Sequence, residues 1–210
     1  DYHKDLCEEY NFILNTDGEK EDGLPLIKSI FEQGLAYEGY DCYCYINTDI
    51  ILLENIQRYI DAIQEDNFCA VGQRIDVWDL PPINFLTESY NDILKKIYPL
   101  KKELHQHVGI DYFCFTPGFW DPKDFPRFRI ARSTFDNWLM NHGITQGQGK
   151  MIDLSYTFQP LQLEPNSRPL IEGKRAEQIN YNRQLGGYIK FGGTSNTPYF
   201  LTQEMNIEKR

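Results

Sequence analysis

The chain has 210 residues, enough for one domain with a sizeable core, and its 14% of aromatic residues is typical of a packed fold rather than a disordered chain. A formal charge of −10 opposes non-specific binding to nucleic acids, whose phosphate backbone requires a basic face. No stretch approaches the roughly 18 apolar residues of a membrane span and no signal peptide is visible, so we expect a cytoplasmic protein without a membrane span.

Residues 1–23 are polar and acidic and predict a loop with one short helix. Apolar residues recur at helical spacing over residues 24–36, and an apolar run around residues 43–48 predicts a strand. A second amphipathic helix is expected over residues 54–64 and a second short strand over residues 68–72. The order of helix, strand, helix and strand is typical of a parallel sheet with crossover helices.

Further along the chain, residues 84–98 predict a helix and residues 110–115 a strand. A short helix is expected over residues 135–140 and a strand over residues 151–158, and the remainder is expected to be irregular. The chain has no internal repeat and no linker. We therefore expect one α/β domain over residues 1–210, with a mostly parallel central sheet flanked by helices.

The polar residues Asn47, Thr48 and Asp49 interrupt the apolar run of residues 43–53. A strand that is buried on both faces reads as a nearly continuous apolar run, and an unpaired carboxylate inside such a strand is costly. The three residues are therefore expected at the carboxyl end of the strand, where open α/β sheets bind ligands. Asp49 could bind Mg²⁺ or Mn²⁺ there, or it could cap the next helix or pair with a basic neighbour.

Arg74 and Asp76 follow the second expected strand. The planar guanidinium of Arg74 suits a phosphate or a carboxylate. The other interpretation of Arg74 is a structural ion pair with Asp76 or Asp79. The spacing of these residues leaves both interpretations open.

Four of the 21 basic residues of the chain fall within ten positions, namely Lys123, Arg127, Arg129 and Arg132. In a chain of charge −10, this concentration could neutralise an anionic ligand such as a diphosphate. The alternative is a solvated loop that is balanced by Asp121 and Asp124.

Asp136 lies inside a hydrophobic helical turn and could act as a general base that accepts a proton from a hydroxyl nucleophile. Its alternative role is an N-terminal helix cap. His105 and His107 form a His-x-His pair in a polar segment, where such a pair is expected to have no role in metal binding.

Five cysteines without a Cys-x-x-Cys pair indicate reduced thiols, two or three of them in core strands, and do not favour a zinc site. The sequence also has no nucleophile elbow and no glycine loop of the P-loop or dinucleotide type. Serine-based and cysteine-based nucleophilic catalysis are therefore not expected. The residues alone indicate an anion-binding α/β domain.

A series of short motifs runs through most of the chain: Gly23–Leu26, Ser29–Glu32, Ile46–Leu52, Gly72–Arg74, Gly109–Phe113, Ala131–Arg132, Asp136–Leu139, Ile152–Asp153 and Asn182–Gly187. In this order and spacing, they resemble the GT-A-fold glycosyltransferases of the nucleotide-diphospho-sugar transferase superfamily. The resemblance covers roughly residues 23–187. It implies a GT-A-like sheet and the transfer of a sugar from a nucleotide-diphosphate donor, with a UDP-sugar expected, to a hydroxyl of a carbohydrate acceptor.

By this resemblance, Asn47, Thr48 and Asp49 occupy the place of the family's Asp-x-Asp motif. Asp49 would be the acid that contacts a divalent cation, Mn²⁺ or Mg²⁺. Asp136 matches the acid that serves as general base in inverting members of the family. A divalent ion and basic side chains would stabilise the leaving diphosphate.

The same resemblance places Arg74 and Asp76 near the donor nucleotide or sugar, and Asp111 and Trp138 near the sugar and the acceptor. Arg132 would also belong to the donor-binding residues. These roles are implied by the family and not by the spacing of the residues alone.

The chain departs from the family at two places. Relatives usually carry a histidine-containing segment after the strand at Ile152, and the corresponding residues 158–162 contain no histidine. The family also begins with a strand-helix-strand unit that cradles the nucleotide base, and by this resemblance the sequence is expected to start after that unit. Either another segment supplies that unit, or the sequence is a piece of a longer chain with further domains, or donor binding is impaired.

These departures keep a different class of function open, a non-catalytic GT-A-like domain that binds a glycan or a partner protein. A nucleotidyltransferase is a second alternative, since it shares a similar sheet. It would require a glycine-rich, basic nucleotide loop near its start, and no such loop is visible.

Overall fold

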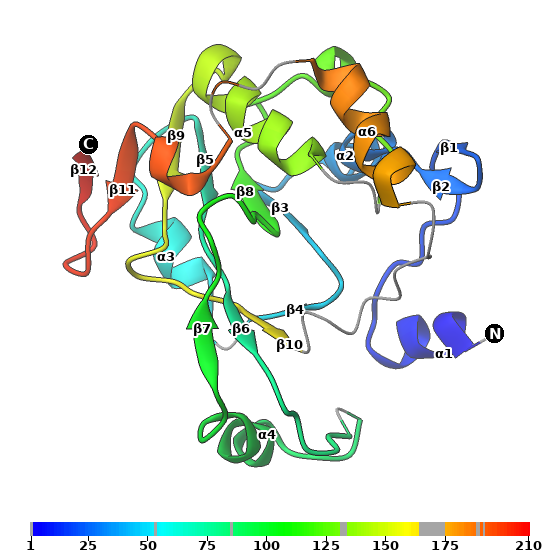
Figure 1. Ribbon diagram of the computed structural model, residues 1–210, viewed down its shortest axis with the longest axis vertical. Helices are drawn as coiled ribbons and strands as arrows, with labels where there is room; N and C mark the ends of the chain where they lie inside the picture. The colour runs from blue at the N-terminus through cyan, green and yellow to red at the C-terminus, as the bar shows by residue number, and fades with distance from the viewer. Residues whose placement is uncertain are drawn as a thin grey trace.

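The computed structural model describes residues 2–52, 54–84, 86–130, 134–163, 175–187, 190 and 192–210. Within them, helices lie on both faces of a six-stranded sheet, and a smaller sheet lies beyond one end of its strands (Figure 1). The predicted α/β class is confirmed. No helix in these residues is long and apolar enough to cross a membrane.

The larger sheet has the strand order β12–β11–β9–β5–β8–β3. Its strands, in that order, are Ile207–Lys209, Tyr199–Leu201, Lys150–Asp153, Phe68–Val71, Tyr112–Phe115 and Tyr43–Ile46. Strands β3, β5, β9 and β11 run in one direction, whereas β8 and β12 run in the other. The prediction of a mostly parallel sheet is therefore wrong, because a strand buried on both faces, such as β8, has the same apolar pattern in either direction.

The smaller sheet has the strand order β4–β10–β6–β7, and only its β10–β6 pair is parallel. These strands are Ile50–Ile51, Leu161–Leu163, Ile75–Val77 and Lys102–Leu104. Strands β1 (Lys20–Glu21) and β2 (Leu24–Pro25) form a separate antiparallel pair. Each of these strands has only two or three residues, too few for an alternating pattern to predict it.

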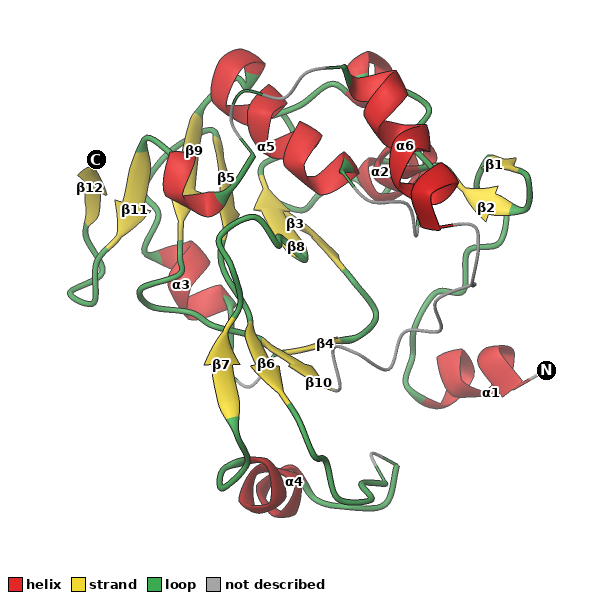
Figure 2. Cartoon of the chain, viewed as in Figure 1, coloured by secondary structure: helices red, strands yellow, loops and turns green. Residues whose placement is uncertain are grey.

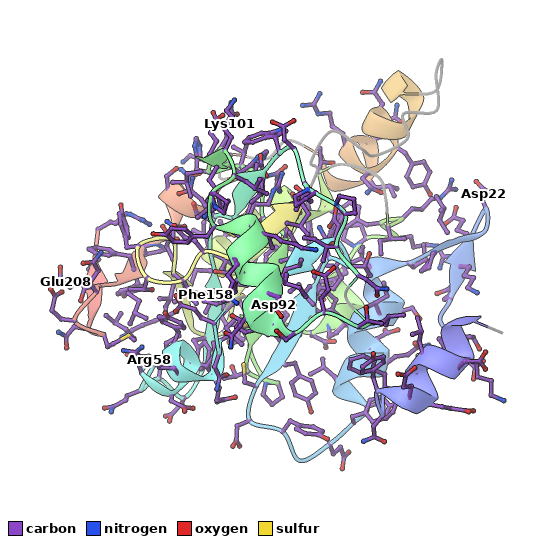
Figure 3. All side chains as sticks on the ribbon, turned by 90° about the horizontal axis from the view of Figure 1, so that it is seen from below. Asp22, Arg58, Asp92, Lys101, Phe158 and Glu208 are labelled. Atoms are coloured by element: carbon purple, nitrogen blue, oxygen red, sulfur yellow. The ribbon has the colours of Figure 1, made fainter. Side chains whose placement is uncertain are left out.

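Helices α2 (Ile27–Leu35) and α5 (Phe135–Gln146) pack on one face of the larger sheet, and α3 (Gln57–Asp61) packs on the other (Figure 2). Phe31 is at the centre of the core between α2, α5 and the larger sheet, with its ring 5.1 Å from that of Phe115. Alternate side chains of β5 and β8 enter the two cores. Charged side chains such as those of Asp22, Arg58 and Glu208 lie at the periphery (Figure 3).

Helix α4 (Tyr90–Ile97) packs on the smaller sheet through Ile93 and Ile97. It begins later than the predicted residue 84, because the Ser89 side chain accepts a hydrogen bond from the Asp92 N–H at 3.3 Å and caps the helix. Helix α5 continues beyond the predicted residue 140. The helix runs through Gly143. A Cβ at this position would come within 2.8 Å of the Met151 sulfur, so the glycine permits close packing of α5 on β9.

The ends of the chain contain the remaining differences. The short helix expected near the start is α1 (Tyr2–Glu9). The strand predicted over residues 151–158 ends at Asp153, where the chain turns. The C-terminal part was expected to be irregular and instead contains α6 (Arg175–Gly186), a 3₁₀ turn at Thr194–Asn196, and strands β11 and β12.

Candidate functional site

Three expected site residues lie together at one end of the strands of the larger sheet. The carboxyl ends of β3 and β5 meet the amino end of the antiparallel strand β8 there. Asn47 follows β3, Arg74 lies three residues after β5, and Asp111 immediately precedes β8. The topology therefore brings together residues that are up to 64 positions apart. Open α/β sheets bind ligands beyond the carboxyl ends of their strands.

Asp111 is the centre of this group and is 5% exposed. Its Oδ1 accepts a hydrogen bond from Asn47 Nδ2 at 2.8 Å, and its backbone carbonyl accepts from the Asn47 N–H at 2.9 Å. The Tyr45 hydroxyl donates to Asn47 Oδ1 at 2.9 Å. Arg74 Nη1 forms an ion pair with Asp111 Oδ2. These bonds fix the Asp111 carboxylate at the end of the β3–β8 ladder.

Arg74 uses each of its three nitrogens within the protein. Besides Nη1, its Nε lies 2.8 Å from Asp76 Oδ1 and its Nη2 lies 3.1 Å from the His105 ring. His105 Nδ1 in turn contacts Asp76 Oδ2 at 2.6 Å. The structural ion pair considered for Arg74 is therefore present with Asp76, and Asp111 is its second partner. A ligand phosphate would have to share or displace one of these contacts.

His105 is a member of the group that the sequence did not identify. Its position follows from the β6–β7 register, in which Ile75 lies opposite Leu104, so that the next residues outward are Arg74 and His105. The His105 N–H donates to the Arg74 carbonyl at 2.9 Å. Gly109 lies beside both side chains, and a Cβ there would come within 2.3 Å of the His105 ring.

Asp136 approaches the group from the first turn of α5. Thr134, two residues earlier, has φ of 82°, a strained value for a β-branched residue, and strained residues cluster at functional sites. Burial raises the pKa of Asp136 to about 6, and the charge of Asp111 adds to the shift, although hydrogen bonds from the backbone of Asn137 and Ile110 oppose it. The Asn137 side chain anchors this turn by donating to the Val108 carbonyl at 2.8 Å.

Tyr45 connects Asp136 to the other acids. Burial raises the pKa of the Tyr45 hydroxyl, and the charges of Asp136, Asp111 and Asp49 raise it further. The phenol therefore stays protonated and can donate hydrogen bonds. We refer below to the buried cluster, named for its buried members Arg74, Asp76 and Asp111, which also includes the half-buried Tyr45, Asn47, His105 and Asp136. With Asp49 beside it, the buried cluster has four carboxylates for one arginine, a balance that suits ligands rich in hydroxyl groups or positive charge.

Thr48 and Asp49 form the turn between β3 and β4, and Thr48 is exposed. Asp49 Oδ2 accepts a hydrogen bond from Gln162 Nε2 at 2.6 Å, and Gln162 is 1% exposed. Among the described residues, no group of three or more His, Cys, Asp or Glu side chains is arranged to hold a metal ion. Among the described residues, Asp49 could supply one carboxylate to a cation at this turn, and waters and a bound substrate could supply further ligands.

Two other expected residues are not part of the buried cluster as described. Trp138 packs among aromatic side chains, with its ring 4.5 Å from that of His142 and 5.3 Å from that of Phe128. Arg132 lies outside the described residues. The roles expected for both stay predictions.

Two arginines of the basic segment, Arg127 and Arg129, are paired with acids near the start of the sequence. Arg127 contacts Glu19 and Glu21, and Arg129 contacts Glu21 and Asp22. These acids lie in and around β1, so the partners are not the Asp121 and Asp124 expected from the sequence. We call these five residues the surface ion-pair group.

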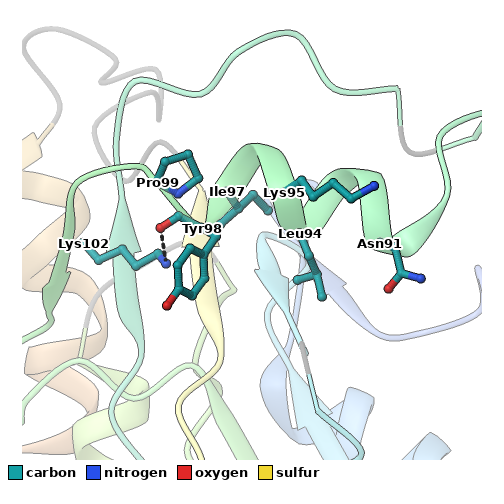
Figure 4. A pocket seen from close by; sticks show the side chains of 7 residues that line it. All are labelled: Asn91, Leu94, Lys95, Ile97, Tyr98, Pro99 and Lys102. Carbon is teal, nitrogen blue, oxygen red and sulfur yellow. Dashed lines mark hydrogen bonds between the residues drawn. The ribbon is translucent and has the colours of Figure 1, made fainter.

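A separate hollow lies on the outer side of α4 and is lined by Asn91, Leu94, Lys95, Ile97, Tyr98, Pro99 and Lys102 (Figure 4). The hydrogen bond from Lys102 Nζ to the Tyr98 carbonyl, 2.9 Å long, crosses one end of it. Of the expected site residues that the structure describes, none lines this hollow.

No family model, no curated protein and no solved structure matches this chain. Its function is therefore inferred from the chemistry of the buried cluster and of the Asp49 turn. This chemistry comprises a carboxylate with a raised pKa, three further acids nearby, and one arginine held between two of them.

Proposed function

We propose that this chain is a glycosyltransferase with a GT-A-like sheet that moves a sugar from a nucleotide-diphosphate-sugar, with a UDP-sugar preferred, to a hydroxyl of a carbohydrate acceptor with inversion. One observation carries the proposal. Five residues expected to act on the donor or acceptor, from four separate parts of the sequence, lie together near the carboxyl ends of β3 and β5, the position at which open α/β sheets bind ligands. They are Asn47, Arg74, Asp76, Asp111 and Asp136.

Asp136 is suited to the role of general base. A catalytic base is most effective when its pKa lies near the working pH, and the pKa of Asp136 is raised to about 6. At neutral pH the carboxylate is mostly ionised and can accept the proton of an acceptor hydroxyl. That hydroxyl would then attack the anomeric carbon, and the nucleoside diphosphate would leave from the opposite face.

Asp76 and Asp111 are suited to binding sugar hydroxyls, because ionised carboxylates are acceptors and hydroxyl groups are donors. Arg74 holds both carboxylates in place through its ion pairs. Its role in this proposal is to position Asp76 and Asp111 and to lower the local negative charge when an anionic donor binds.

A divalent ion, Mn²⁺ or Mg²⁺, fits the Asp49 turn only as an ion shared with the donor. Magnesium is commonly bound by one or two carboxylates together with substrate phosphates, so Asp49 and the donor diphosphate could hold it without a protein cage. When bound, the ion would neutralise charge on the leaving diphosphate. Gln162 belongs to the segment where relatives carry a histidine, and its contact with Asp49 is consistent with this location.

A second candidate is a non-catalytic domain that binds a glycan or a partner protein. It is favoured by the engagement of all three Arg74 nitrogens within the protein, which leaves the buried cluster without an unpaired cation for a diphosphate. The two candidates differ in whether a nucleotide-sugar binds at all.

The test measures donor binding first and transfer second. A bound donor at a hundredfold excess over Kd stabilises the protein by about 2.7 kcal/mol, or about 5–10 °C in Tm, and a thermal-shift screen of nucleotide-sugars with and without Mn²⁺ detects it. Among variants, Asp136→Asn should reduce transfer by roughly 10²–10⁴-fold and leave donor binding intact. Asp49→Asn should weaken the part of donor binding that depends on Mn²⁺.

Asp66→Asn is the matched control, because Asp66 is exposed and lies between α3 and β5. It should leave binding and transfer unchanged. Transfer that survives in both Asp49→Asn and Asp136→Asn would show that the proposed roles are wrong. Silence of the unaltered protein toward every donor would favour the non-catalytic candidate.

A further inference from the structure

Two cysteines lie directly opposite each other on neighbouring strands. In the antiparallel pair of β3 and β8, Cys44 is the register partner of Cys114. Their sulfur atoms are 3.0 Å apart, and both thiols are free. Directly opposed residues in antiparallel strands have Cα atoms about 4.5–5.5 Å apart, which lies within the range of about 4.4–6.8 Å that a disulfide requires.

The two thiols differ in exposure, and this difference assigns their chemical roles. Cys44 is exposed, so a small oxidant can reach its sulfur from solvent. Cys114 is 1% exposed and donates its S–H to the Cys44 sulfur. Of the other three thiols, Cys69 is buried and Cys7 and Cys42 are partly buried, whereas Cys44 is exposed and already contacts a second sulfur.

We propose that Cys44 and Cys114 are a modification site at which a reversible disulfide joins β3 to β8 in the presence of a low-molecular-weight disulfide such as oxidised glutathione. The Cys44 thiolate attacks one sulfur of the oxidant, which forms a mixed disulfide and releases one small thiol. Cys114 then loses its proton and attacks the Cys44 sulfur, which releases the second small thiol. In total, two protein thiols are oxidised to one disulfide, and one small disulfide is reduced to two thiols.

This disulfide would hold β3 and β8 together close to the candidate site. Strand β3 is at the edge of the larger sheet, with β8 as its neighbour. The Asn47–Asp111 contact lies three register positions along the same ladder from Cys44 and Cys114. The bridge would join residues 70 positions apart, so it would restrict the unfolded chain strongly.

The experiment counts thiols. The folded protein is treated with oxidised glutathione, the excess is removed, and the protein is unfolded without reductant and alkylated. The number of alkylated cysteines is expected to fall from five to three in a monomer, with one linked peptide pair containing Cys44 and Cys114. The oxidised protein should also have a Tm about 5–15 °C higher, and this increase should disappear after treatment with reductant.

Cys44→Ser should abolish the loss of the two thiols, and this exposed position avoids a change in the core. Cys42→Ser is the matched control on the same segment and should still lose two thiols. The proposal is overturned if all five thiols of the unaltered protein remain, if the linked pair contains Cys42, or if Cys44→Ser loses as many thiols as the unaltered protein. None of these outcomes depends on whether the chain transfers a sugar.

Discussion

Arg74 in the buried cluster and Arg127 in the surface ion-pair group each contact two carboxylates, but their environments differ. Arg74 is 8% exposed and pairs with Asp76 and Asp111, which are also buried. The Arg127 side chain is 52% exposed and pairs with glutamates that face solvent. Exposed pairs are screened by water and salt, whereas removing one partner of a buried pair leaves an uncompensated charge. An equal number of ion pairs therefore does not mean an equal role in the fold.

One carboxylate in each region has a shifted pKa, and the two shifts have opposite directions. Burial raises the pKa of Asp136 to about 6. In the surface ion-pair group, the hydrogen bond from Arg129 lowers the pKa of Glu21, and burial opposes this only in part. Desolvation has the largest effect on the pKa of Asp136, whereas the hydrogen bond from the charged Arg129 has the largest effect on the pKa of Glu21. A carboxyl group whose pKa is raised toward neutral pH in the folded protein is the better candidate for proton transfer.

The largest effect is expected for Arg74→Met, which keeps a long side chain and removes the charge. Asp76 and Asp111 would remain buried without their cation, so the free energy of unfolding should fall by about 3–5 kcal/mol. Urea unfolding at neutral pH measures this change. The double variant Arg74→Met/Asp111→Asn should be less destabilised than the sum of the two single variants, since it removes both charges of one pair. Additive effects would show that the two side chains do not interact as described.

The next effect concerns pH. The pKa of Asp136 is about 6 in the folded protein against an ordinary value of 3.8, so the folded state holds this proton to a higher pH than the unfolded chain does. Stability from this group should therefore fall as the pH rises from about 4 to about 6 and stay level above. Asp136→Asn removes the effect and should stabilise the protein at pH 7 by about 1–3 kcal/mol.

Urea midpoints of the unaltered protein and Asp136→Asn, compared between about pH 4 and pH 7, measure this difference. The two proteins should be closest in stability at the acidic end and diverge as the pH rises. Curves that stay parallel over the whole range would contradict the raised pKa. A gain in stability together with a loss of transfer would place Asp136 among residues kept for activity at the expense of stability.

Part of the cluster could be predicted from apolar runs and part only from the family resemblance. Asn47 follows the run of β3, whereas Asp111 lies inside the strand expected over residues 110–115 and is expected at the site only through the resemblance. Both strands are where the runs place them. The direction of β8 could not be predicted, since four consecutive buried residues give no information on which way the strand runs. The antiparallel direction is nevertheless what brings the start of β8 beside the end of β3.

His105 could not be predicted from its neighbours. It follows β7, a three-residue strand whose side chains are all exposed, so no alternation of apolar and polar residues marks it. The partners of Arg74 were predictable as a type, an acid two positions away, but Asp111 became a partner only through pairing across the sheet. Long-range register is the information that a single sequence contains least of.

The smallest effect is expected for Arg127→Ala in the surface ion-pair group. Its contacts with Glu19 and Glu21 are exposed, and when the guanidinium is removed Glu19 is hydrated and Glu21 keeps its ion pair with Arg129. The Tm should change by no more than about 2 °C, and added salt should reduce even this difference because it screens exposed charges. Scanning calorimetry at low and high salt measures both.

Arg129→Ala is the comparison that gives this prediction its meaning. Arg129 belongs to the same group, but its side chain is only 12% exposed and its guanidinium lies 3.8 Å from the centre of the Tyr181 ring. Packing on an aromatic ring is lost together with the charge, so this variant should lower the Tm more than Arg127→Ala and should be less sensitive to salt. Equal effects at the two positions would mean that the burial of an arginine does not determine its contribution to stability in this protein. The contrast between Arg74 and Arg127 would then need another cause.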